Sequence, residues 1–107
     1  MVNQGDIIVL DLDPQAGHEQ KGRRPALVVS NNIFNRYSNM YMICPIANTN
    51  KSHAFHIPLN NTTSTSGVIL CDQARILDIK ARNYKFAERV PNEILEKAKN
   101  LLIRFIE

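Results

Sequence analysis

Every apolar run before residue 91 is short, and most are rich in Val and Ile and end at Gly, Pro, Asn or Asp. Such runs form strands, because β-branched side chains favour extended backbone and the flanking residues favour turns. We expect a single helical turn at 33–36 and strands at 6–12, 26–30, 40–46, 54–59, 68–71 and 86–90. In the fourth strand, Phe55, Ile57 and Leu59 should share one face and His56 the other.

The residues after Pro91 follow a helical pattern instead. Pro91 and Glu93 suit a helix start, and one stripe is apolar: Ile94, Leu95, Ala98, Leu101, Leu102, Phe105 and Ile106. Short strands followed by one amphipathic helix predict a mainly β fold with a C-terminal helix, as a small, partly closed antiparallel β-barrel. With 107 residues, the chain is expected to form one domain over residues 1–107.

Membrane association and secretion are not indicated by the sequence. No apolar run approaches the roughly 20 residues that a membrane-spanning helix needs, and the first residues lack the pattern of a secretion signal. We therefore expect a soluble, cytoplasmic protein. Cys44 and Cys71 each lie in an apolar run without a second cysteine at metal-ligand spacing, so both are expected to be free and reduced. We predict no metal and no cofactor.

The basic residues fall in two clusters, which matter more than the modest net charge of +3. Lys21, Arg23 and Arg24 lie in one Gly-flanked loop, and a second group follows a later strand: Arg75, Lys80, Arg82 and Lys85. Two basic clusters can converge on a phosphate chain. An ordinary solvated surface would explain the charge equally well.

The loop at residues 17–25 holds the groups that RNA cleavage requires. It contains two glycines, a histidine, a carboxylate, an amide and three cations, and it ends at Pro25, which restrains Arg24 to an extended conformation. Cleavage of RNA by its own 2′-hydroxyl needs a base, a donor for the leaving 5′ oxygen and cations that stabilise the charged phosphorane. Such chemistry needs no metal.

Several motifs, in order along nearly the whole chain, resemble the MazF/PemK (Kid) toxin family. They are Gly5-Asp6-Ile7, Asp13-Pro14, Gly17-His18-Glu19-Gln20, Gly22-Arg23-Arg24-Pro25-Ala26-Leu27-Val28, Cys44-Pro45-Ile46, Gly67-Val68-Ile69-Leu70-Cys71-Asp72-Gln73-Ala74-Arg75 and Lys80-Ala81-Arg82. The resemblance implies an SH3-like or CcdB-like barrel, a homodimer, and sequence-selective, metal-independent cleavage of single-stranded RNA to 2′,3′-cyclic phosphate and 5′-hydroxyl ends. It also implies inhibition by a cognate antitoxin with an acidic, partly disordered tail.

By position, the essential arginine of this family falls on Arg24. Proton transfer and phosphate stabilisation are both possible roles, and we favour the second because a guanidinium stays protonated and is a poor base. Glu19 is a candidate general base, or it orients Arg24.

A second catalytic position in the family, a Thr or Ser after the third strand, reads Ala47 here. This chain departs from the family there. Asn48, as a hydrogen-bond donor, and Thr49, as a hydroxyl, are the expected substitutes.

The other expected RNA contacts are His18, Gln20, Lys21, Arg23, Gln73 and Arg75. The resemblance places Gln73 and Arg75 in either the RNA groove or the dimer seam. Alternatively, Asp72 and Arg75 pair to brace a turn. His53 and His56 suggest a two-histidine ribonuclease pair, but on an extended strand residues three apart face different ways. We expect the loops at 48–53 and 62–66 to set the cleavage sequence.

Two other functions fit parts of the pattern. A gyrase-poisoning toxin can share the barrel without cutting RNA, but it does not need an arginine before proline in a Glu-bearing loop. An oligonucleotide-binding barrel would carry alternating aromatic residues on its strands, whereas this chain has 7% aromatic residues and no tryptophan. The ribonuclease prediction accounts for more of the sequence.

Overall fold

The computed structural model describes residues 1–13, 17–49 and 53–107. Expectations for Pro14 and for residues 50–52 lie outside these ranges. The strands are β1 (Asp6–Asp11), β2 (Arg23–Val28), β3 (Tyr41–Ala47), β4 (His56–Pro58), β5 (Val68–Leu70), β6 (Arg75–Leu77) and β7 (Lys85–Arg89). The helices are α1 (Asn32–Ser38) and α2 (Asn92–Arg104), with 3₁₀ turns η1 (Cys71–Gln73) and η2 (Ile79–Arg82).

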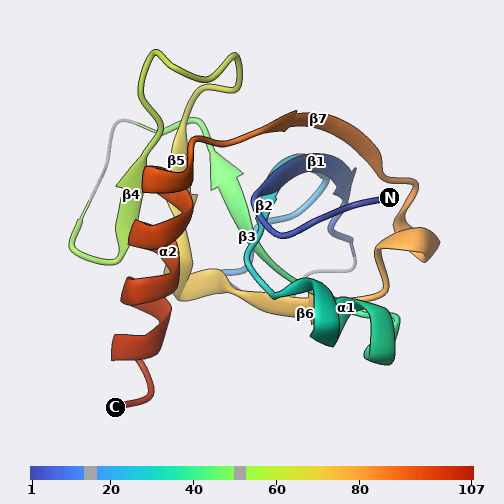
Figure 1. Cartoon of the computed structure of the whole chain (residues 1–107). Helices are drawn as coiled ribbons and strands as arrows, with labels where there is room; N and C mark the ends of the chain where they lie inside the picture. Colours follow the sequence, from blue (N-terminus) through green and yellow to red (C-terminus); the bar gives the residue numbers. More distant parts are fainter. Residues whose placement is uncertain (14–16, 50–52) are drawn as a thin grey trace.

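The strands form one curved antiparallel sheet in the order β4-β5-β3-β2-β1-β7, with β6 also paired to β3 (Figure 1). The predicted mainly β fold with a C-terminal helix is confirmed. Among the described residues, no hydrogen-bonded ladder joins the two end strands, so the sheet curves like a barrel without closing.

The central strands are buried on both faces, which explains why they read as nearly continuous apolar runs. Side chains alternate between two core clusters: Ile7 faces the cluster beneath α2, while Ile8 and Leu10 face the cluster on the opposite side. Helix α2 completes the first cluster with Ile94, Leu95 and Ala98.

The prediction that the apolar stripe of the C-terminal helix extends to Ile106 is wrong. Helix α2 ends at Arg104, and Phe105 and Ile106 lie beyond it with 42% and 88% of their surface exposed. Phe105 packs edge-on against Phe55, which directly precedes β4, at a ring separation of 5.4 Å.

Most strand ends differ from the prediction by a residue or two, and three differences are larger. Strand β2 begins at Arg23 instead of residue 26, because residues 23–25 pair with β1 and Arg23 lies opposite Asp11. Strand β4 is only three residues long, since a turn precedes it and leaves Phe55 48% exposed, off the expected Ile57–Leu59 face. Strand β6 was not predicted. Its run is short, and Arg75 and Ile76 are not fully buried.

Cys44 and Cys71 are free and buried, as predicted. A hydrogen bond between the two thiols, together with burial, raises the pKa of Cys44 well above its ordinary value and keeps that thiol protonated. None of the helices formed by the described residues is long and apolar enough to cross a membrane.

Candidate nucleic-acid interface

The 17–24 segment lies at the rim of the sheet, where β1 ends and β2 begins. Leu12 N–H donates to the Gly22 carbonyl at 2.9 Å, and Gly22 N–H donates to the Asp13 carboxylate at 3.1 Å. Gly22 adopts a φ of +77°, a conformation that favours glycine. These contacts fix the direction in which the segment enters β2.

Arg24 is positioned by the strand itself. It pairs with Leu10 of β1, is half-buried, and donates from Nε to the Lys21 carbonyl at 3.2 Å. Among the described residues, this leaves its two terminal NH₂ groups for a ligand. Asp13, Lys21, Gly22 and Arg23 join it around an open pocket of about 470 Å³. A guanidinium fork held in this way suits a phosphate.

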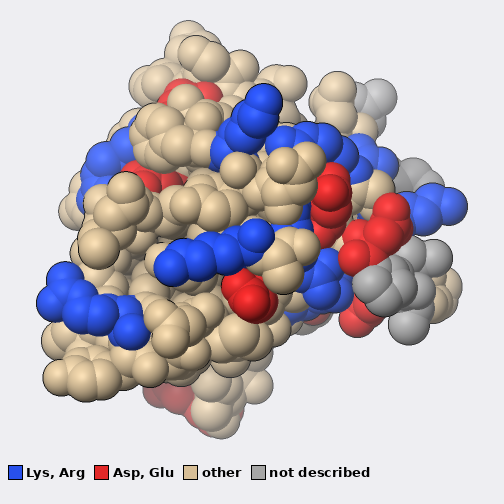
Figure 2. Space-filling view, turned by 90° about the vertical axis from the view of Figure 1, so that its right-hand side faces the viewer, with Lys and Arg blue, Asp and Glu red and all other residues tan. Residues whose placement is uncertain are grey.

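The two basic clusters do converge. Arg23 donates to the Asp11 carboxylate at 3.1 Å and to the Asn83 carbonyl at 2.8 Å. Arg82 donates to the carbonyls of Asp11 and Asp13 at 3.1 and 3.0 Å. On the face shown in Figure 2, basic side chains are interspersed with acidic ones instead of forming one continuous basic track. The arginines therefore hold the loops together as well as adding positive charge.

Gln73 of η1 braces the 17–24 segment from the other side. Its Oε1 accepts from Gln20 N–H at 2.9 Å, and its Nε2 donates to the His18 carbonyl at 3.3 Å. Both ends of this amide are thus engaged by the loop backbone. The geometry favours a positioning role for Gln73.

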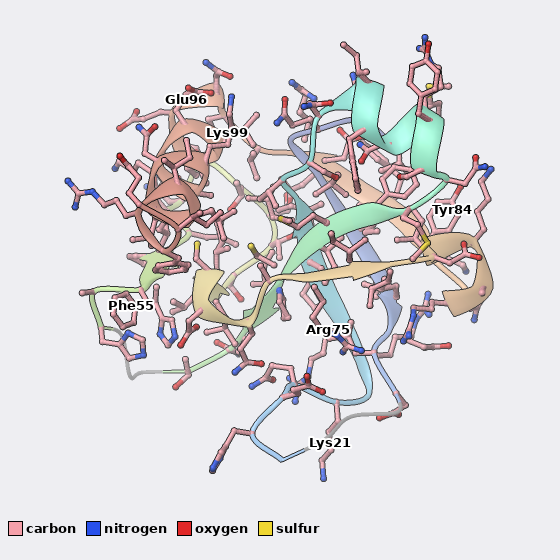
Figure 3. The ribbon with its side chains drawn as sticks, turned by 90° about the horizontal axis from the view of Figure 1, so that it is seen from below. Lys21, Phe55, Arg75, Tyr84, Glu96 and Lys99 are labelled. Atoms are coloured by element: carbon pink, nitrogen blue, oxygen red, sulfur yellow. The ribbon has the colours of Figure 1, made fainter. Side chains whose placement is uncertain are left out.

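A second open pocket, of about 340 Å³, lies between the 17–24 segment and η1. Its lining residues are His18, Glu19, Asp72, Gln73, Ala74 and Arg75. In Figure 3, the Arg75 side chain lies between β6 and the loop that carries Lys21, and it donates to the Leu12 carbonyl at 3.3 Å. Glu19 lines this pocket, whereas Arg24 lines the pocket that also contains Lys21 and Arg23.

Asn48 and Thr49 follow the end of β3, Asn48 exposed and Thr49 half-buried. Ala47 is buried, with 8% of its surface exposed, and lies opposite Val68. Gly67 allows this close packing, since a Cβ added there would lie 2.6 Å from the Ala47 carbonyl oxygen. A small apolar side chain therefore fills position 47, where the resemblance implied a hydroxyl.

The prediction that His53 and His56 face different ways is wrong. His56 N–H donates to the His53 carbonyl at 3.0 Å, which closes a turn before β4 and brings the two rings to a centroid distance of 3.6 Å. Asp72 faces both imidazoles, with Oδ1 3.2 Å from His56 Nε2, so the alternative in which Asp72 pairs with Arg75 is also wrong. Only the two-histidine spacing signalled this cluster in the sequence.

The 62–66 loop is held by Glu88 of β7. The carboxylate accepts from Thr65 Oγ1 at 2.7 Å, from Ser64 N–H at 3.0 Å and from Thr65 N–H at 2.6 Å. The Thr65 hydroxyl, followed by the Ser64 amide, lowers the pKa of Glu88 below its ordinary value. No sequence signal pairs Glu88 with this loop.

A small curved β-sheet with a helix against it, and two pockets lined partly by a basic loop, define a compact β protein suited to a polyanion. The chain matches, over residues 3–106, the family described as PemK-like, MazF-like toxin of type II toxin-antitoxin system. The chain belongs to this family.

Endoribonucleases of known name are similar to this chain in sequence, and a solved structure is similar to it in fold. Endoribonuclease PemK of Escherichia coli is 38% identical, with 94% of this chain and 82% of PemK covered. Endoribonuclease toxin MazF of Escherichia coli K12 is 36% identical, with 94% and 93% covered. The crystal structure of MazF from Deinococcus radiodurans superimposes with a TM-score of 0.91 at 33% identity, covering 98% of this chain and 96% of that one.

Proposed function

We propose that this toxin is an endoribonuclease that cuts single-stranded RNA through the RNA's own 2′-hydroxyl, leaving 2′,3′-cyclic phosphate and 5′-hydroxyl ends without a metal. The observation that carries the proposal is Arg24, fixed at the sheet rim by strand pairing and by its Nε contact to the Lys21 carbonyl. Relatives named as endoribonucleases support the activity.

Arg24 is assigned to the charged phosphorane. Its terminal NH₂ groups, beside Lys21 and Arg23, provide the preorganised positive charge that stabilises a phosphorane most strongly. A guanidinium does not lose its proton near neutral pH, so the base is another group.

Glu19 is the candidate for that base. It lines the pocket that also contains His18 and Arg75. Orientation of Arg24 is the alternative role for Glu19, since both residues belong to the 17–24 segment. Asn48 and Thr49 are assigned hydrogen bonds to the RNA, because both directly follow β3 and neither is fully buried.

The remaining predicted RNA contacts divide into two groups, according to whether their side chains donate hydrogen bonds to the protein backbone. His18 and Lys21 are exposed on the loop, and Gln20 is half-buried there. Arg23, Gln73 and Arg75 each donate to a backbone carbonyl, so they shape the surface that the RNA would meet. We assign direct contacts to the first group and mainly positioning to the second.

We further propose that residues 1–107 act as one toxin domain in the cytoplasm, where mRNA is translated, and that a cognate antitoxin with an acidic tail inhibits it. Crystal structures titled MazE-MazF, from Deinococcus radiodurans, support such a partner. An acidic tail would suit the pocket lined by Lys21, Arg23 and Arg24.

A homodimer is part of the same proposal. Exposed apolar side chains gather between α1 and α2, where Phe34, Ile76 and Ile103 border a groove of about 350 Å³. Surfaces of this kind commonly serve association. Light scattering that shows a monomer at micromolar concentration would contradict the dimer.

The test of the cleavage proposal is Arg24→Ala, with Lys97→Ala as the control. Lys97 is an exposed cation on α2 that, among the described residues, forms an ion pair only with Glu93 on its own helix. Loss of a stabilising donor costs about 100- to 1000-fold in rate, so Arg24→Ala should lose at least about 100-fold of its cleavage rate, while Lys97→Ala stays near wild type. Circular dichroism should show both variants folded. A folded Arg24→Ala protein that cuts at the wild-type rate would refute the proposed site.

A further inference from the structure

We propose that His53, His56 and Asp72 form a binding site for a divalent transition-metal ion of the zinc class, separate from the proposed metal-independent cleavage chemistry. One ligand atom from each of the three side chains can be chosen so that all lie within 4.8 Å of one another. Two imidazole nitrogens and one carboxylate oxygen are a donor set that suits zinc.

The distances fit a tetrahedral ion with small adjustments. Metal bonds of about 2.0–2.1 Å to nitrogen and oxygen separate neighbouring tetrahedral ligand atoms by roughly 3.3 Å. His56 Nε2 lies 3.2 Å from Asp72 Oδ1, which already matches such an edge. His53 Nε2 lies 4.0 Å from the other carboxylate oxygen, Asp72 Oδ2, so this ring has to turn toward the ion.

A second observation concerns the other nitrogen of His56. Its Nδ1 is buried and has no hydrogen-bond partner among the residues that the structure describes, and each such buried polar atom calls for an explanation. Because a carboxylate only accepts hydrogen bonds, the contact with Asp72 places the ring proton on Nε2 while no metal is bound. A metal at Nε2 would take the place of that proton, and the ring would then carry a proton on Nδ1.

His53 is held in place and yet able to adjust. Its Nδ1 accepts from Phe55 N–H at 3.2 Å, so in the metal-free chain the proton sits on Nε2. Metal binding at Nε2 requires this ring to turn and release that contact. The side chain is 52% exposed, which leaves room for the turn. Its ring contacts Phe55 edge-on at 5.5 Å and the His56 ring at 3.6 Å.

Asp72 also lines the pocket between the 17–24 segment and η1, so the metal site borders that pocket. His18 and Glu19 line the same pocket. Three protein ligands leave a fourth position for water. A bound ion would engage the Asp72 carboxylate and add positive charge at the pocket edge.

The test is isothermal titration calorimetry of tag-free, EDTA-treated and dialysed protein with zinc chloride at about pH 7, where imidazole is mostly neutral. One zinc ion per chain is expected at micromolar concentration, with a matching rise in Tm. His53→Ala should weaken binding by at least about tenfold. His18→Ala, which removes the remaining histidine of the chain, is the control and should bind as wild type does.

Three results would overturn the site: no zinc binding at micromolar concentration, unchanged affinity in His53→Ala, or equal loss in His18→Ala. His53 is half exposed, so its replacement decides the matter even if His56→Ala does not fold. The readout is zinc affinity, not RNA cleavage. Failure here leaves the proposed ribonuclease function untouched, and failure of that function leaves the zinc site standing.

Discussion

Replacing Gln73 by methionine removes both hydrogen bonds that hold the 17–24 segment to η1, while it keeps the length of the side chain. The bonds run from Gln20 N–H to Oε1 at 2.9 Å and from Nε2 to the His18 carbonyl at 3.3 Å. The substitution therefore isolates the brace from the packing around it.

Each such hydrogen bond contributes about 0.5–1.5 kcal/mol net, so the loss is about 1–3 kcal/mol. The bonds tie a surface loop to a 3₁₀ turn, so we expect most of this energy to be lost from the ordering of the loop. If all of it is needed to hold the loop in its cleaving conformation, kcat/KM falls by roughly 5- to 150-fold, at about 1.4 kcal/mol per tenfold.

The assay is the cleavage rate of a fluorescent single-stranded RNA, measured beside thermal unfolding. Glu96→Gln, in an exposed pair with Lys99 on α2, is the control and should change neither quantity appreciably. Wild-type kcat/KM in Gln73→Met would refute the positioning role. A fall in Tm large enough to unfold the protein at the assay temperature would show instead that Gln73 supports the whole fold.

Two further substitutions test the loops around the site, and Gly17→Ala is the control for the first. Gly67→Ala should lower Tm by about 4 °C or more, because φ is +125° and the new Cβ would lie 2.6 Å from the Ala47 oxygen. Gly17→Ala, where nothing lies within 4 Å, should cost less, and equal losses would contradict the packing. Glu88→Gln should lower Tm near neutral pH. Because the folded-state pKa of Glu88 lies below the ordinary 4.5, the stabilisation is present above that value and disappears as the pH falls through the lowered pKa. A Tm difference between wild type and Glu88→Gln that is independent of pH would count against the carboxylate's role.

The strand pattern and the helix were predictable because burial on one or both faces leaves a local signature in the sequence. Residues 6–12 and 68–71 read as strands from their own side chains, and Ile94, Leu95 and Ala98 mark the helix by spacing. The end of α2 was not predictable in this way, since Phe105 continues the stripe but packs on Phe55 instead of on the main core.

The site was predictable to the extent that its residues are neighbours in the chain. Residues 17–24 carry most of the candidate groups within one loop. The Gln73 brace and the Glu88 anchor each join segments more than 20 residues apart, and the stacking of His53 on His56 depends on a turn where a strand was expected. Contacts of this kind arise from the fold and leave no local pattern.

The most direct test of the central claim is incubation of the purified protein with a long single-stranded RNA in EDTA, followed by mapping and chemical identification of the new ends. We predict discrete cuts with 5′-hydroxyl and 2′,3′-cyclic phosphate ends, at rates that EDTA does not change. Intact RNA, or cleavage that appears only when Mg²⁺ is added, would contradict the account.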